Sequence, residues 1–224
     1  MKVLMGALLA TLVAIPALAQ KGVDARLQAA TETLQAAMNA NDKGIPQDLL
    51  NKASCVVVIP SVKAGGFIVG AEYGRGFFTC RRASGVGWSS PGCISVKGGK
   101  FGLLIGGKET DVIMLVMNKN GMEHLLSDKF QLGGEASAAG GPVGRDSSAM
   151  TDAEMHAEIL TYSRSRGIFG GLDLAGAAVT QDEKSNDELY GESITNKQII
   201  GGTEHTPEAA QAFIHTLDRI SSRK

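Results

Sequence analysis

The sequence predicts an α+β fold, a mainly antiparallel, glycine-rich β barrel or sandwich with flanking N- and C-terminal helices. Short β-branched or aromatic runs recur about every ten residues in the middle of the chain. Apolar residues follow helical spacing at both ends. Glycine makes up 29 of 224 residues. Because these glycines lie inside apolar runs rather than in a linker, we expect close backbone packing within the sheet.

The two terminal helices are predicted by apolar stripes with a spacing of three or four residues. A second short helix is expected after the first, starting at Pro46, because the fixed φ of proline suits a first helical turn. Thr206 and Pro207 are typical of the start of the last helix. The N-terminal stripe consists of Val23, Leu27, Ala30, Leu34 and Met38. The C-terminal stripe consists of Ala210, Phe213, Leu217 and Ile220.

The central runs are expected to be strands because each is bounded by Gly, Pro, Ser or Asn-Gly turn signals. The runs between them are too short for crossover helices, so we expect antiparallel pairing. A later strand at 157–162 is expected to pair with a run at 168–179. The six central runs are 56–59, 67–72, 77–82, 93–96, 101–105 and 112–117.

Residues 1–19 are typical of an export signal. Lys2 supplies the positive start, 3–15 is almost entirely apolar, and 17–19 reads Ala-Leu-Ala, the small-x-small pattern of a cleavage site. The apolar run is shorter than the roughly 20 residues of a transmembrane helix, although an uncleaved anchor is the alternative. We therefore predict an exported protein, periplasmic or secreted, whose residues 20–224 form a single domain.

The three cysteines would meet an oxidising compartment after export. Cys80 and Cys93 flank a Gly/Ser-rich turn and form a candidate disulfide, and the strand register decides whether their Cβ atoms meet. Cys55 begins an apolar run and is expected to be a buried thiol. Since no CxxC pair or nearby His completes a ligand set, we expect no metal and no other cofactor.

Charge and motifs argue against two classes of function. Lys and Arg number 22 against 23 Asp and Glu, with no long basic run, so nucleic acid is not an expected partner. Residues 102–109 nearly match a phosphate-binding loop, but Glu109 stands where Ser or Thr would bind Mg²⁺. Residues 87–91 lack the last glycine of a nucleophile elbow. We therefore predict that the protein is not an enzyme.

Short basic groups are the best candidates for a binding surface. A rim of such residues can bind lipid phosphates, because the planar guanidinium forms a fork of donors. The alternative is a scatter of solvated charges. Arg75, Lys97 and Lys100 are expected in turns that share this rim. The candidate lipid-binding residues are Lys63, Arg81, Arg82, Arg164 and Arg166.

Seven sequence blocks, taken together and in order, resemble the SYLF family. They cover about 45–200, which we take as the core of the domain. The blocks are ASCVVVIP at 53–60, GGFIVG at 65–70, WSSP at 88–91, DVIMLVMN at 111–118, GPVGR at 141–145, YSRSRGIFGG at 162–171 and YG at 190–191.

The resemblance implies a binding module rather than an enzyme, since eukaryotic SYLF domains are described as lipid- and actin-binding. Export would separate this chain from cytosolic actin, so actin is not an expected partner. The N-terminal helix has only Lys21 and Arg26 near its start, which does not favour strong attraction to lipid headgroups. We expect an exported, non-catalytic module that binds anionic lipid or an envelope surface. The alternative is a structural or protein-interaction component of the cell envelope without lipid affinity.

Overall fold

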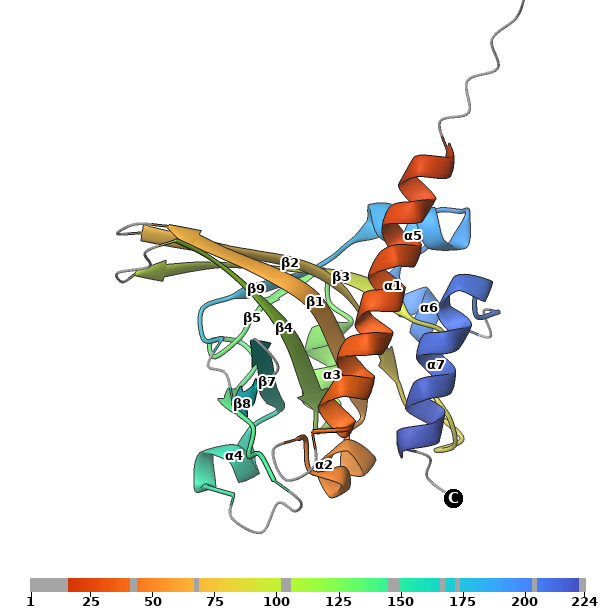
Figure 1. Cartoon of the computed structure of the whole chain (residues 1–224). Coiled ribbons are helices and arrows are strands. Elements are labelled where there is room, and N and C mark those ends of the chain that lie inside the picture. Colours follow the sequence, from red (N-terminus) through yellow and green to blue (C-terminus); the bar gives the residue numbers. More distant parts are fainter. Residues whose placement is uncertain are drawn as a thin grey trace, which may run out of the picture.

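The structure is a computed structural model that describes residues 16–40, 44–66, 69–101, 106–144, 150–165, 168–171, 174–202 and 205–221. Within these residues one nine-stranded sheet runs in the order β5-β9-β3-β2-β1-β4-β7-β6, and β8 also pairs with β7 (Figure 1). Only the β6–β7 pair is parallel among the described strand pairs. The strands are β1 Cys55–Gly66, β2 Val69–Cys80, β3 Gly92–Phe101, β4 Gly106–Val116, β5 Lys129–Gln131, β6 Ala138–Gly140, β7 Ile159–Ser165, β8 Ile168–Gly171 and β9 Ala178–Gln181.

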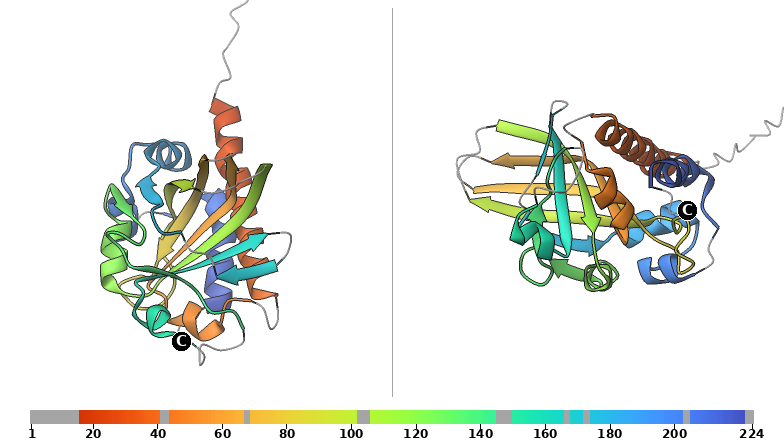
Figure 2. Two further views of the ribbon diagram at one scale, coloured as in Figure 1. Left: turned by 90° about the vertical axis from the view of Figure 1, so that its left-hand side faces the viewer. Right: turned by 90° about the horizontal axis from the view of Figure 1, so that it is seen from below.

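The sheet curls into a half-barrel and stays open (Figure 2). The predicted α+β class, with a mainly antiparallel sheet, is confirmed. The expected closure into a barrel or a two-sheet sandwich was wrong. The strand order ends at β5 and β6, which have three residues each and do not pair with one another. Strands this short cannot supply the continuous hydrogen-bonded ladder that closes a barrel.

Two long helices lie side by side on one face of the sheet, α1 Pro16–Met38 and α7 Glu208–Ser221 (Figures 1 and 2). Both terminal helices were predicted, and their apolar stripes are buried at Val23, Leu27, Phe213 and Leu217. The expected cleavage point, after Ala19, falls within the first turns of α1. The remaining helices are α2 Gln47–Lys52, α3 Lys119–Leu125, α4 Asp152–His156, α5 Glu183–Tyr190 and α6 Asn196–Gly201.

Both faces of the central strands are buried, which explains their nearly continuous apolar sequences. On β1, Val56 and Val58 pack toward α1 and α7, whereas Val57 and Ile59 pack into a second cluster on the opposite face. The first cluster also contains Trp88, which is fully buried. Burial on both sides removes the alternation that a half-exposed strand would show.

A bulge in β1 reverses which face its side chains occupy. The pairing of β1 shifts by one residue against both neighbours, between Val58 and Lys63 against β2 and between Ile59 and Val62 against β4. Ser61 adopts a positive φ of 55°, and its N–H donates to Asp111 Oδ1 at 3.0 Å. Because the side chains of a strand alternate, one inserted residue turns Lys63 from the second cluster's side to the side of α1.

Strand β2 runs unbroken where the sequence predicted two strands, 67–72 and 77–82, with Arg75 in the turn between them. That prediction was wrong, and residues 67–68 lie outside the described residues. Gly76 is required here by close approach, since a Cβ at this position would lie 2.7 Å from Ile59 Cα and would also meet the Val58 carbonyl oxygen. The run at 168–179 likewise divides into β8 and β9, which pair with different strands.

Candidate binding groove

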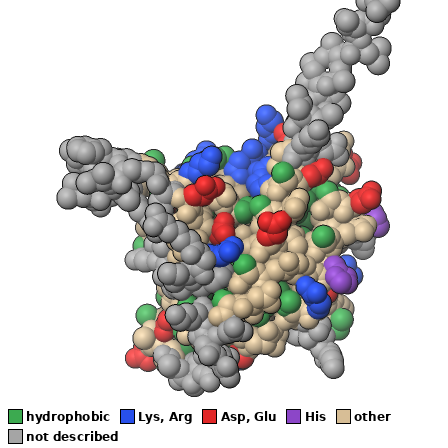
Figure 3. All heavy atoms as spheres, in the orientation of Figure 1, with side chains coloured by type: hydrophobic (Ala, Val, Ile, Leu, Met, Phe, Trp, Pro, Cys, Tyr) green, Lys and Arg blue, Asp and Glu red, His purple; other side chains and the backbone are tan. Residues whose placement is uncertain are grey.

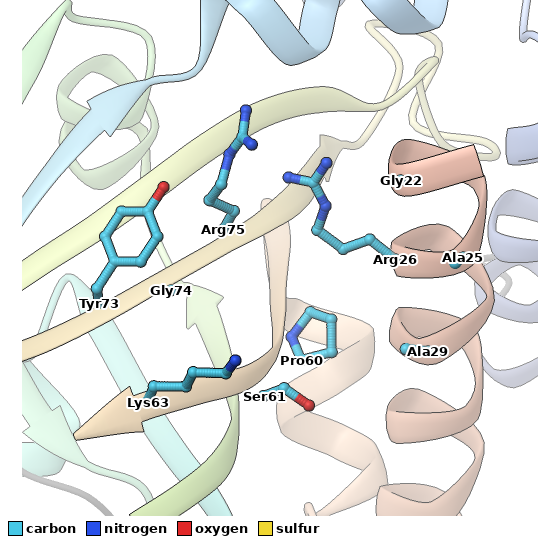
Figure 4. A pocket seen from close by; sticks show the side chains of 10 residues that line it. All are labelled: Gly22, Ala25, Arg26, Ala29, Pro60, Ser61, Lys63, Tyr73, Gly74 and Arg75. Carbon is cyan, nitrogen blue, oxygen red and sulfur yellow. The ribbon is translucent and has the colours of Figure 1, made fainter. Parts of the chain in front are cut away.

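A groove of about 460 Å³ lies between α1 and the β1–β2 strands. Helix α1 forms one wall, β2 forms the other, and the bulge of β1 lies between them (Figure 4). Three of the ten lining residues are cationic and none is acidic, so the lining carries positive charge. The ten are Gly22, Ala25, Arg26, Ala29, Pro60, Ser61, Lys63, Tyr73, Gly74 and Arg75.

The three cations come from three different elements. Arg26 projects from α1 and Arg75 from β2, and their guanidinium groups extend toward one another from opposite walls (Figure 4). Lys63, which the bulge turns to this side, is exposed. Figure 3 shows several Lys and Arg side chains gathered along this upper edge of the molecule, between α1 and the outer ends of the strands. The fold thus concentrates positive charge at one place on a chain whose net charge is −1.

One carboxylate, Asp182, holds both guanidinium groups. Arg75 donates from Nε to Oδ2 at 2.5 Å and from Nη2 to Oδ1 at 2.8 Å, a bidentate pair. Arg26 Nη1 lies 3.8 Å from the same Oδ2. The hydroxyl of Ser185 accepts from Arg75 Nη2 at 2.7 Å and from Arg26 Nη1 at 3.4 Å. Residues that are 156 positions apart in the chain therefore meet at one cluster.

The pKa values follow from this arrangement. Burial raises the pKa of Asp182, but hydrogen bonds from Arg75 and Ser185 and the charge of Arg75 outweigh it, and the net pKa is lowered. The hydrogen bond to Asp182 raises the pKa of Arg75. Burial lowers the pKa of Arg26, and the nearby charge of Arg75 lowers it further. The cluster is therefore fully ionised at neutral pH, with two guanidinium charges against one carboxylate.

An aromatic side chain borders the cations. Tyr73 pairs with Lys63 on β1 and with Lys97 on β3, so the three side chains form a row on the groove side of the sheet. Lys97 Nζ lies 5.8 Å from the centre of the Tyr73 ring. Tyr73 is 45% exposed, high for a large aromatic residue. An exposed ring among cations suits a ligand or surface with polar and apolar parts.

The structure places Arg81 and Arg82 away from the groove that Lys63 lines. Arg81 stacks on Trp88 at 3.9 Å, and Arg82 Nε donates to the Trp88 carbonyl at 2.8 Å. Both lie beyond the end of β2, about 26 to 30 Å along the strand from Tyr73 at about 3.3 Å per residue. Arg164 Nη1 donates to Asp111 at 3.5 Å. Arg166 lies outside the described residues.

Of the four candidates within the described residues, Lys63 alone lines the groove. The binding role of Arg81, Arg82, Arg164 and Arg166 stays a prediction.

The disulfide joins Cys55 and Cys80, not Cys80 and Cys93. The candidate pair was therefore wrong, as was the expectation of a free thiol at Cys55. Cys55 and Cys80 are direct partners in the β1–β2 register, whereas Cys93 pairs with Phe77 on the other side of β2. Cys93 is the buried free cysteine, and burial is the main cause that raises the pKa of its thiol.

Sequence reasoning missed the part that Arg26 and Asp182 play in the groove. Arg26 lies three residues after Val23 and four before Ala30, so it interrupts the buried stripe of α1. A cation at such a position needs a partner or an opening to solvent, and this signal was present in the sequence. Asp182 is the N-cap of α5 and accepts a hydrogen bond from Ser185 N–H, a local role that gives no sign of the two arginines.

Two features are absent from the described residues, a metal-binding cluster and a membrane-spanning helix. These residues contain no group of three or more His, Cys, Asp or Glu side chains that could hold a metal ion. Among the same residues, no helix combines the length and hydropathy that crossing a bilayer requires.

Comparison with known proteins establishes the family. Residues 97–220, more than half of the chain, match the family model Ysc84, described as "Las17-binding protein actin regulator". The chain belongs to the Ysc84 family. This confirms the family resemblance drawn from the seven sequence blocks. Within the matched Ysc84 region lie Asp182 and Ser185, whereas Arg26, Lys63 and Arg75 precede it.

Similar proteins occur in fungi and animals. The chain is 29% identical over 180 residues to LAS seventeen-binding protein 3 of Saccharomyces cerevisiae, covering 79% of this chain and 39% of that protein. It is 29% identical over 186 residues to the human SH3 domain-containing YSC84-like protein 1, covering 83% and 54%. It is 30% identical over 177 residues to the Schizosaccharomyces pombe SH3 domain-containing protein PJ696.02, covering 78% and 41%. The Ysc84-family chain thus spans two fifths to about half of these relatives.

Proposed function

We propose that this protein is a non-catalytic binding module that takes anionic lipid headgroups into the groove between α1 and β2. The convergence of Arg26, Lys63 and Arg75 on a groove without an acidic lining residue carries the proposal. Guanidinium groups suit phosphate oxygens because they offer parallel donors in one plane. The names of the relatives describe a binding protein and an SH3 domain-containing protein, which supports a module that binds rather than one that catalyses.

Export of the protein is the second part of the proposal. The signal-like pattern of residues 1–19 supports it, and so does the Cys55–Cys80 disulfide, a bond that persists mainly in oxidising compartments. A periplasmic or secreted location would also separate the protein from cytosolic actin, so we predict that actin is not a partner. We expect N-terminal sequencing of the native protein to begin at Gln20. A native chain that retains residues 1–19 in the cytoplasmic fraction would contradict export.

Vesicle co-sedimentation tests the binding. We expect the protein to sediment with vesicles of phosphatidylcholine mixed with phosphatidylglycerol, but not with phosphatidylcholine alone, and to dissociate as salt rises. Replacing Lys63 or Arg75 by Ala should weaken binding about fivefold each, since a cation near an anionic surface contributes about 1 kcal/mol. The matched control is Lys119→Ala on α3, which removes an exposed lysine that is paired with Glu123.

The same assay distinguishes the groove from the rim proposed from sequence. Variants at Arg81 and Arg82 should bind like the wild type, because both are held at Trp88, beyond the end of β2. A larger loss in those variants than in Lys63→Ala would place the site at the rim. A protein that binds neither type of vesicle at low salt contradicts the lipid proposal. Affinity capture from an envelope extract would then test the alternative, a protein-interaction component.

A further inference from the structure

An acidic residue, Asp182, lies at the centre of the cationic cluster. A groove that binds anions would gain attraction if Asp182 were absent, yet this carboxylate contacts both guanidinium groups. We propose that Asp182 is the positioning residue of the groove, which holds Arg26 and Arg75 side by side so that a helix and a strand supply a single anion-binding fork. This inference rests on the proposed function for the identity of the anion, but the geometry exists without a ligand.

Asp182 is itself held in place by two elements. Its N–H donates to the Cys93 carbonyl on β3 at 3.0 Å, and its Oδ1 accepts from Ser185 N–H at 3.3 Å at the start of α5. The residue is 8% exposed. A carboxylate fixed in this way presents its two oxygens in one orientation, and the bidentate pair then fixes the plane of the Arg75 guanidinium.

Arg26 and Arg75 would separate without this counter-ion. The two guanidinium groups carry like charges, and Arg26 is largely buried, with its guanidinium 5.6 Å from the centre of the Phe77 ring. Like charges in a partly buried place repel more strongly than in water. The side chain of Arg75 is 31% exposed, so it can turn toward solvent once Asp182 no longer holds it.

The bound arrangement leaves donors for a ligand. Arg75 uses Nε and Nη2 on Asp182 and Ser185, and Arg26 uses Nη1. Within the part of the chain that the structure describes, Arg75 Nη1 and Arg26 Nη2 donate to no protein acceptor. A guanidinium has five N–H groups, so each arginine keeps donors for an oxyanion while it is held. Asp182 therefore orients the two guanidinium groups and leaves some of their N–H donors available to a ligand.

Two explanations of Asp182 predict opposite signs. If only net charge matters, the three lining cations and the adjacent Asp182 together carry +2, so removing the charge of Asp182 raises this to +3 and strengthens the binding of anions. If Asp182 acts by positioning, removing its charge releases the arginines and weakens binding. Asp182→Asn separates the two, because Asn caps a helix about as well as Asp and has nearly the same shape.

Glu183→Gln is the matched control. Glu183 is the next residue, exposed in the first turn of α5, and its replacement changes the net charge by the same amount. With vesicles of phosphatidylcholine and phosphatidylglycerol at low salt, we expect Asp182→Asn to bind about tenfold more weakly than the wild type. We expect Glu183→Gln to bind equally or slightly more tightly. Asp182→Asn binding as tightly as Glu183→Gln would overturn the inference.

A second readout needs no ligand. In nitrogen-15 NMR spectra, the Arg75 Nε–H should exchange slowly with water in the wild type and in Glu183→Gln, because it is hydrogen-bonded to Asp182. The Arg75 Nε–H should exchange rapidly in Asp182→Asn, while the backbone amide spectrum remains that of a folded protein. A protected Nε–H in Asp182→Asn would refute positioning even if vesicle binding fails. Wild-type protein that shows the protected Nε–H but does not bind anionic vesicles would refute the lipid proposal and leave the positioning role of Asp182 standing.

Discussion

Removing the Cys55–Cys80 disulfide should lower the free energy of unfolding by about 3 kcal/mol. The bond spans 25 residues, and constraining a loop of that length in the unfolded chain accounts for a loss of this size. Both cysteines are fully buried, so Cys55→Ala with Cys80→Ala is preferred to serine, which would bury hydroxyl groups. Urea denaturation of the wild type with and without reductant should show the same loss as the double variant.

Cys93→Ala provides the control for this experiment. Cys93 is buried but free, so its variant should keep the response to reductant, while the double variant should lose it. Thiol titration of the unfolded, unreduced protein should find one free thiol. Three free thiols, or a wild-type free energy of unfolding that does not change with reductant, would contradict the Cys55–Cys80 disulfide.

The error in the disulfide prediction follows from one error about the strands. The glycines around Arg75 were interpreted as a break, so the hairpin formed by β1 and β2 was not recognised. With both strands at their full length, Gly66 pairs with Gly70, and the same antiparallel pairing places Cys55 opposite Cys80. Glycine marks turns and also marks close approach of backbones, and the local sequence does not distinguish the two.

The terminal helices could be predicted because helical spacing is a local property, as the burial of Leu27 and Leu217 shows. The site could not be predicted in the same way. Arg26 and Asp182 are far apart in the chain, and the side of the sheet that Lys63 occupies depends on a one-residue bulge. Local pattern identified basic residues, but tertiary packing decides which of them converge on one groove.

Replacing Gly76 by Ala should lower the free energy of unfolding by about 3 kcal/mol, as large as the effect of the disulfide. A methyl group at this buried position would lie 2.7 Å from Ile59 Cα and would meet the Val58 carbonyl oxygen, both part of the backbone of β1. Backbone atoms of a central strand cannot rotate away as a side chain can, so the strands must move apart. Equilibrium unfolding in urea measures the loss.

Gly65→Ala is the matched control on the neighbouring strand. Gly65 is exposed, no atom lies within 4 Å of a Cβ built there, and its φ lies outside the left-handed region. Alanine should therefore leave stability unchanged or raise it by about 0.5 kcal/mol, because it reduces the entropy of the unfolded chain. Equal losses in the two variants would show that the sheet needs glycine for its flexibility. A loss confined to Gly76→Ala would show that β2 needs glycine where β1 approaches it, beside the groove that Arg75 lines.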